Sequence, residues 1–152
     1  MITRAIINNF NTALTRKWNK TYWAFDIHGT IIVPNYQAEG IPTTFYPYAK
    51  EALQQISIRK DIVPILYTCS HPHQIQLYLE FFERNGIHFP YVNENPEVVT
   101  GQSSEYGNYD KKFYCNVLAE DRAGFSPMED WYEIKKLLDR YPESLLGQFN
   151  KD

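Results

Sequence analysis

The sequence predicts an α/β fold: a Rossmann-like three-layer sandwich with a mainly parallel central sheet and no separate cap domain. Short apolar runs typical of buried strands alternate with amphipathic segments at helical spacing, which favours parallel strands joined by helices. The chain has 152 residues, the size of one domain, and residues 1–152 are expected to form a single unit. Apolar residues make up 43% and charged residues 22%, which excludes disordered and fibrous classes.

The first part of the chain contains two predicted helices and a strand. Residues 3–20 form an amphipathic helix that we expect to pack on the sheet, with a membrane-surface role as the alternative. Residues 22–25 are an apolar run typical of a buried strand. Residues 33–45 contain two prolines and a glycine and predict a loop, after which Pro47 is placed to open the next helix.

The middle of the chain repeats the pattern of strand and helix. Residues 62–67 predict a second buried strand, in which Pro64 fits at a strand start or a sheet edge because proline lacks the N–H donor. Ser70 is the expected N-cap of a helix over 71–85. A third strand is expected over 89–92.

The last part begins with a long polar segment. Residues 93–110 are rich in Asn, Gly and Ser and predict a loop of a length that is usually functional or disordered. A strand is expected over 113–119 and a helix over 127–141. The core therefore spans 22–141, and the tail 142–152 is weakly specified.

Composition narrows the class of protein. Fifteen Lys and Arg against 18 Asp and Glu give a net charge of −3, which argues against a dedicated nucleic-acid or membrane-surface binder. Cys69 and Cys115 cannot form a disulfide framework and indicate a reduced, cytoplasmic protein. The sequence shows no signal peptide and no apolar segment near the ~20 residues of a spanning helix. Aromatic residues make up 16%, which suggests an aromatic-rich core and a stacking surface.

Polar side chains end three of the apolar runs. Asp26 ends the first, Thr68 the second, and Glu120 with Asp121 the last. Ligands of open α/β sheets bind outside the carboxyl ends of the strands, so these side chains are expected to meet at one edge. Crowded carboxylates repel one another unless a cation lies among them, and carboxylates with water suit Mg²⁺. Each residue taken alone could instead cap a helix or turn.

Two further features belong to this expected site. Lys112 lies nine residues before Asp121 and could supply a positive charge, with Lys111 as its rival. Gly29 and Thr30 suit a tight turn after the first strand, which would present Asp26 and the backbone carbonyl of residue 28.

Four segments, in order, resemble the motifs of the haloacid dehalogenase (HAD) superfamily. Residues 25–31, Phe-Asp-Ile-His-Gly-Thr-Ile, resemble its first motif, Asp-x-Asp-Gly-Thr after a buried strand. Residues 66–68, an apolar strand end followed by Thr, resemble the second motif, and Lys112 resembles the lysine of the third. Residues 117–124 resemble the acidic fourth motif, in the Asp-Asp-Arg form of small capless members.

The resemblance implies magnesium-dependent phosphoryl transfer to a water molecule. Asp26 would be the nucleophile and form an aspartyl-phosphate. Magnesium would be held by Asp26, the carbonyl of His28 and Asp121, while Glu120 would be a direct or water-mediated ligand or would orient the lysine. Thr68 and Lys112 would hold phosphate oxygens.

Two positions depart from the motif pattern. His28 replaces the Asp that protonates the leaving oxygen and then activates water. An imidazole with an ordinary pKa near 6.5 can do both at neutral pH, or the change marks slow or lost turnover. Glu120 replaces the first Asp of the acidic pair, and its extra methylene moves the carboxylate.

The gaps between motifs predict an open site. Residues 31–46 and 86–111 are mostly loop and cannot hold a folded cap. An open site suits a large phosphorylated substrate, such as a nucleic-acid end or glycan, unless a lid comes from elsewhere; a phosphorylated small molecule stays open as the alternative. A neighbouring subunit of a homo-oligomer could serve as a lid. Tyr106 and Tyr109, in the 93–110 loop, could form a partial lid.

Other interpretations stay open beside the phosphohydrolase. A catalytically weak or inactive phosphate- and metal-binding protein would keep the same fold and site, and an interaction module would use the 3–20 helix. Cys69, His71 and His73 are close in sequence, but no fourth ligand has zinc-site spacing, and we expect helix capping and solvated histidines. Cys69 lacks a visible base partner and is expected to be a small buried residue rather than a nucleophile.

Overall fold

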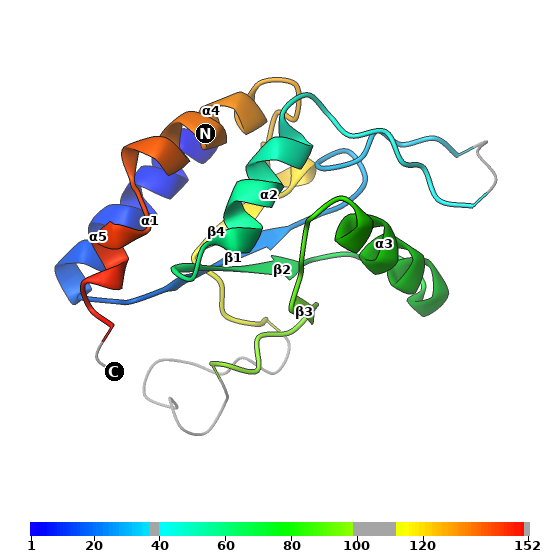
Figure 1. Cartoon of the computed structure of the whole chain (residues 1–152). Coiled ribbons are helices and arrows are strands. Elements are labelled where there is room, and N and C mark those ends of the chain that lie inside the picture. The colour runs from blue at the N-terminus through cyan, green and yellow to red at the C-terminus, as the bar shows by residue number, and fades with distance from the viewer. Residues whose placement is uncertain (37–39, 99–111, 151–152) are drawn as a thin grey trace.

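The computed structural model describes residues 1–36, 40–98 and 112–150 and has the predicted α/β architecture (Figure 1). A four-stranded, all-parallel sheet has the strand order β3-β2-β1-β4, and helices pack against it. No cap domain separate from this sheet is present in the described ranges. In chain order the elements are α1 (Ile2–Arg16), β1 (Thr21–Phe25), α2 (Ala49–Ile58), β2 (Ile62–Leu66), α3 (Pro72–Arg84), β3 (Tyr91–Val92), β4 (Val117–Ala119), the 3-10 helix η1 (Asp121–Ala123), α4 (Asp130–Arg140) and α5 (Ser144–Gly147).

The two faces of the sheet are covered differently. On one face, Trp23 of β1 packs edge-on against Phe10 of α1, and Phe25 stacks on Trp131 of α4. On the other face, Tyr22 meets Tyr114 edge-on, with ring centroids 6.0 Å apart. Tyr114 belongs to the connection between β3 and β4, so this connection, where it is described, lies on the face opposite α1 and α4.

Helix α1 packs into the core, as predicted, but ends at Arg16 rather than at residue 20. Lys17 adopts the left-handed conformation, with φ of 58°, and its N–H donates to the carbonyl of Leu14. The N–H of Trp18 donates back to the carbonyl of Ala13, which closes the helix end. In the part of the chain that the structure describes, no helix combines the length and the apolar character needed to cross a membrane.

Pro64 lies in the middle of β2, where its missing N–H costs nothing. β2 pairs with β1 along its length, but β3 pairs only with Ile65 and Leu66. The carbonyl of Leu66 accepts from Asn93 on the β3 side, and Pro64 has the same orientation two residues earlier. The absent donor therefore faces a stretch of β2 that is still a sheet edge, as the sequence predicted.

Three local predictions differ from the structure. Helix α3 is capped by His71 rather than Ser70: the N–H of His71 donates to Oε1 of Gln74 at 3.3 Å, while Ser70 pairs with Thr68. Cys69 is exposed rather than buried, because it lies in the loop between β2 and α3. Helix α2 begins at Ala49, after Tyr48 in a left-handed conformation.

The predicted strands near the C-terminal side are shorter than expected, and the tail is better ordered. Of residues 89–92 only Tyr91–Val92 pair, and of residues 113–119 only Val117–Ala119 do. The tail contains α5, whose Leu146 is fully buried in the core.

Candidate functional site

The register of the sheet places the predicted site residues at one edge. Phe25 of β1 pairs with Leu66 of β2 and with Ala119 of β4, so the residues that follow these three stand level with one another. They are Asp26, Tyr67 and Glu120. Two backbone hydrogen bonds hold the row: the N–H of Asp26 donates to Ala119 at 3.0 Å, and that of Tyr67 donates to Phe25 at 2.7 Å.

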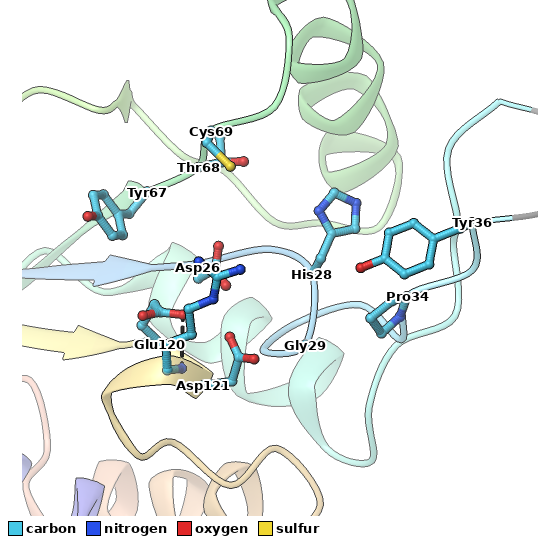
Figure 2. Close-up of a pocket in the computed structure, with 11 residues that line it drawn as sticks. Asp26, His28, Gly29, Pro34, Tyr36, Tyr67, Thr68, Cys69, Glu120 and Asp121 are labelled. Atoms are coloured by element: carbon cyan, nitrogen blue, oxygen red, sulfur yellow. Dashed lines mark hydrogen bonds between the residues drawn. The ribbon is translucent and has the colours of Figure 1, made fainter.

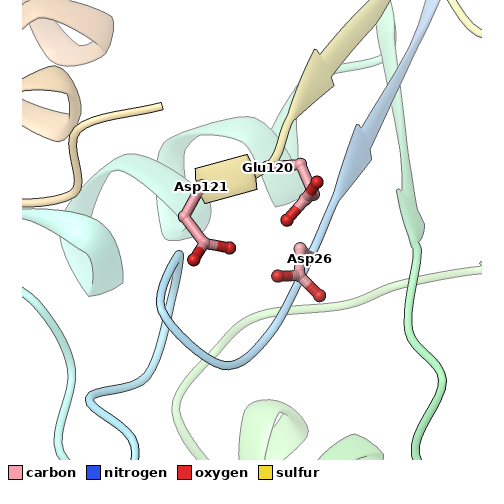
Figure 3. Close-up of side chains that lie close together, drawn as sticks. All are labelled: Asp26, Glu120 and Asp121. Carbon is pink, nitrogen blue, oxygen red and sulfur yellow. The ribbon is translucent and has the colours of Figure 1, made fainter. Parts of the chain in front are cut away.

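Three carboxylates converge at this edge (Figure 3). Asp26, Glu120 and Asp121 each offer an oxygen, and these oxygens all lie within 4.8 Å of one another. Among the described residues, none of the three forms an ion pair. Burial raises the pKa of Asp26 to about 7; the backbone N–H of Ile27 opposes the rise, while a hydrogen bond with Asp121 and the charges of both neighbours add to it. Burial and the neighbouring carboxylates therefore both favour the protonated form of Asp26.

Thr30 joins the turn after β1 to the turn after β4. Its buried hydroxyl donates to Oδ2 of Asp26 at 3.5 Å and accepts the N–H of Asp121 at 3.1 Å. Its carbonyl accepts the indole N–H of Trp131 at 2.7 Å. One threonine thereby holds two of the carboxylate-bearing residues in place.

Gly29 allows the close approach of these two turns. Its φ is +78°, and a Cβ built there would lie 2.8 Å from Oδ2 of Asp121. A side chain at this position would be strained and would collide with the carboxylate. The glycine of the first motif is therefore required by the position of Asp121.

Glu120 has a structural contact as well as a place in the cluster. Its Oε1 accepts the backbone N–H of Arg122 at 3.0 Å and so caps η1. The capping function that the sequence left open for these residues thus applies to Glu120.

The side chain of His28 contacts helix α3. Its Nε2 lies 2.6 Å from the hydroxyl of Tyr78, and the two rings meet edge-on with centroids 5.3 Å apart. Burial lowers the pKa of His28 and raises the pKa of Tyr78 to about 12, so both groups are neutral near pH 7. Tyr78 is 1% exposed, and because a buried hydroxyl needs an acceptor, we infer that it donates to Nε2, which would leave the ring proton on Nδ1. Sequence reasoning placed Tyr78 only in the core.

Thr68 is held by a residue that the sequence placed in a loop. The Oδ1 of Asn93 accepts the backbone N–H of Thr68 at 2.8 Å, and its Nδ2 donates to the carbonyl of Thr68 at 2.7 Å. Asn93 follows β3 with a φ of 55°, which asparagine tolerates better than most residues. The hydroxyl of Thr68 accepts the N–H of Ser70 at 3.1 Å.

The three carboxylates, His28 and Thr68 line an open cleft of about 510 Å³ (Figure 2). Its walls comprise Asp26, His28, Gly29, Pro34, Tyr36, Tyr67, Thr68, Cys69, Glu120, Asp121 and Arg122.

The cations are arranged differently from the prediction. Lys112 is exposed and does not line the cleft; its charge acts on Cys115, where it opposes the rise that burial gives to the pKa of the thiol. Arg122 lines the cleft instead, and only its place directly after the acidic pair could have indicated it. Lys111, Tyr106 and Tyr109 lie outside the described residues.

Cys69, His71 and His73 do not form a metal site in the described part of the chain, where the three carboxylates are the group of possible ligands that converges. The rings of His71 and His73 stack on each other with centroids 6.0 Å apart.

Fold and site together define an α/β protein with an acidic cluster at the carboxyl edge of a parallel sheet. No protein-family model matches this chain, and no curated protein matches it. The structure of a conserved protein from Bacteroides thetaiotaomicron is similar, with a TM-score of 0.57 and 22% identity over 81% of this chain and 93% of that one. At this identity the similarity establishes the fold alone.

Proposed function

We propose that the protein is a magnesium-dependent phosphohydrolase of the HAD type that acts through an aspartyl-phosphate. One observation carries the proposal: three carboxylates converge at the carboxyl edge of the sheet, and one of them, Asp26, begins a segment that resembles the nucleophile motif. Two free cysteines fit a reducing compartment, and the cytoplasm is the proposed location.

The donor set suits magnesium. The ion prefers oxygen ligands, and a dication would stabilise the ionised form of Asp26, whose pKa is raised by burial first and by the neighbouring carboxylates second. Asp26, Asp121 and the carbonyl of His28 would hold it, with Glu120 contributing the oxygen that does not cap η1. Bound there, magnesium would offset negative charge on the transferring phosphoryl group.

The residues of the chain divide the reaction between them. A carboxylate oxygen of Asp26 attacks phosphorus, the bond from phosphorus to the leaving oxygen breaks, and that oxygen takes a proton. A water molecule then attacks the phosphorus of the aspartyl-phosphate, gives up a proton, and regenerates Asp26 with release of inorganic phosphate. The imidazolium form of His28 is the proposed proton donor in the first step, through Nδ1, and the neutral ring that this step leaves accepts the proton of the water at Nδ1 in the second, because Nε2 faces Tyr78.

The phosphate oxygens need a cationic partner besides the metal. The family resemblance assigns this function to Lys112, whereas the cleft itself is lined by Arg122. Substitution of each residue by alanine distinguishes them. The substitution that removes the phosphate-binding cation should raise KM for phosphate esters, and the other substitution should leave KM unchanged.

A catalytically weak or inactive phosphate- and metal-binding protein is the second candidate. The hydrogen bond between His28 and Tyr78 favours it, since it commits one of the two imidazole nitrogens to a buried hydroxyl. The position of Lys112 off the cleft lining favours it as well.

Phosphate release in the presence of magnesium decides between the two candidates. The substrates are small phosphate esters, nucleotides and oligonucleotides with 5′- or 3′-phosphates. We expect wild-type turnover that chelation abolishes and that Asp26→Asn lowers by about 10³-fold or more. Glu97→Gln, which changes a carboxylate outside the cleft, is the matched control. Background rates for the wild type on every substrate would favour the binding protein, and an active Asp26→Asn would exclude Asp26 as the nucleophile.

Magnesium binding is common to both candidates and is tested separately. Isothermal titration of magnesium into the wild type and Asp121→Ala should give much weaker binding for the variant. Equal affinities would exclude the proposed metal site.

A further inference from the structure

We propose that the cleft contains an aromatic subsite, formed by Tyr67 and Tyr36, that selects phosphate esters bearing a planar ring, with nucleotides as the substrate class. The inference rests on the proposed function for the position of the phosphate. It rests on different residues, however, because the family resemblance assigns no chemical role to either tyrosine.

Tyr67 is fixed beside the carboxylates. It directly precedes Thr68 and stands level with Asp26 in the register of the sheet. Its backbone N–H donates to Phe25, and its ring meets that of Phe113 at an interplanar angle of 63°, with centroids 5.9 Å apart. The residue is nevertheless 43% exposed and lines the cleft. An exposed ring that is already held in place loses little conformational entropy when a ligand stacks on it.

Tyr36 lies on the opposite side of the same cleft. Figure 2 shows its ring and that of Tyr67 on either side of Asp26 and Asp121. It is 91% exposed, the highest value among the exposed large hydrophobic residues of the described chain, and Pro34 lines the wall beside it. A single exposed aromatic residue needs no explanation, but here two such rings flank one group of carboxylates.

The residues that line the cleft indicate which kind of phosphate ester it would bind. A phosphate at Asp26 leaves the rest of the ester to extend over the walls, where the aromatic rings offer flat apolar surfaces. A nucleobase attached to the sugar adds a planar ring that can stack on one of them, which a sugar phosphate lacks. Stacking of a base on an aromatic side chain contributes about 1–3 kcal/mol, equivalent to about 5- to 150-fold in affinity.

A pair of ligands that differ only in the base tests the subsite. The probes are the C–P-linked phosphonate analogues of adenosine 5′-monophosphate and ribose 5-phosphate, which carry the same phosphoryl group and sugar and cannot be hydrolysed. We expect isothermal titration with magnesium to give at least about 5-fold tighter binding of the adenosine analogue to the wild type. Because turnover is not needed, this ratio is informative even if phosphate release fails.

The variants locate the effect. Tyr67→Leu and Tyr36→Leu should each reduce the ratio and leave the affinity for the ribose analogue within about 2-fold. Tyr36→Leu replaces a 91% exposed side chain, so this variant should fold even if Tyr67→Leu unfolds. Tyr132→Leu, which removes an exposed ring on α4 away from the cleft, should leave the ratio unchanged. Equal affinity for the two analogues, binding of neither, or a ratio insensitive to both cleft variants would overturn the proposal.

Discussion

Carboxylates at the amino ends of the strands and those at the carboxyl ends have opposite environments. Near the amino ends of the strands, two acids have partners: Asp61, 1% exposed, accepts two hydrogen bonds from Arg59 at 2.8 and 2.7 Å. Glu97 accepts from Lys20 and from the hydroxyls of two tyrosines, Tyr22 and Tyr91. Burial raises the pKa of Glu97, but these donors outweigh it and the net pKa is lowered.

At the carboxyl ends of the strands, the neighbours of each acid are the other acids of the cluster. Burial, with smaller contributions from Asp121 and Glu120 beside it, raises the pKa of Asp26 to about 7. Arginine, lysine and tyrosine side chains therefore donate to Asp61 and Glu97, whereas Asp26, Glu120 and Asp121 form no ion pair among the described residues. We propose that the unpaired carboxylates of the cleft serve ligand binding, and stability measurements can test the contrast acid by acid.

The largest effect is expected at the buried ion pair. Asp61→Ala leaves the guanidinium of Arg59, 9% exposed, without its carboxylate, so the free energy of unfolding should fall by about 3 kcal/mol in urea titrations. Arg59 keeps its bonds to the carbonyls of Leu138 and Tyr141. An apolar double variant, Arg59→Met with Asp61→Leu, should recover much of the loss. A loss below about 1 kcal/mol for Asp61→Ala would show that the pair is not needed for stability.

Asp26→Asn should have the opposite sign in metal-free protein. The folded pKa of about 7 lies above the ordinary 3.8, so ionisation costs the folded state stability as pH rises from about 4 through 7. Asparagine cannot ionise, so at pH 8 the variant should gain about 1–2 kcal/mol, allowing for solvent screening, and at pH 4 almost nothing. Thermal unfolding in chelator at both pH values measures the difference. A variant less stable than wild type at pH 8 would contradict the raised pKa of Asp26.

Glu97→Gln should change the free energy of unfolding in the opposite direction from Asp26→Asn. A lowered folded pKa adds stability that is present above the ordinary 4.5 and is lost as pH falls through the folded value. At pH 7 the variant should lose about 0.5–1 kcal/mol, and in strong acid the two proteins should be equally stable. If the loss were the same at every pH, lost packing rather than lost charge would explain it.

Tyr78→Phe should change stability least, by less than about 1 kcal/mol, because only one hydroxyl is removed. The informative readout is the tautomer of His28, seen in the ¹⁵N shifts of its ring nitrogens. The wild type should carry its proton on Nδ1, and the variant should populate both tautomers. A wild-type ring protonated on Nε2 would reverse the hydrogen bond inferred here.

The fold was predictable because it depends on patterns that are local in sequence. Apolar runs identify β1 and β2, and helical spacing identifies α1 to α4. The ends were less predictable: α1 ends at Lys17 through a left-handed residue that is not a glycine, and short pairing at β3 and β4 depends on partners far away in sequence.

The candidate site was predictable where polar residues directly end strands. Asp26, Glu120 and Asp121 meet because parallel strands align their carboxyl ends. Asn93 and Tyr78 were not predictable as site residues, because one acts through an uncommon backbone conformation and the other from the buried side of a helix. Such contacts appear only once tertiary packing is known.

The strand order has a consequence for how the chain acquires its cleft. Trp23 of β1 pairs with Val117 of β4, 94 residues later, so a nascent or truncated chain that ends before β4 has Asp26 but no acidic cluster. Until β4 docks, β1, with five buried residues, presents an open edge to any other extended chain. Closing so long a loop is entropically costly and slow. The step that completes the cleft is therefore also the step that protects the folding chain from self-association.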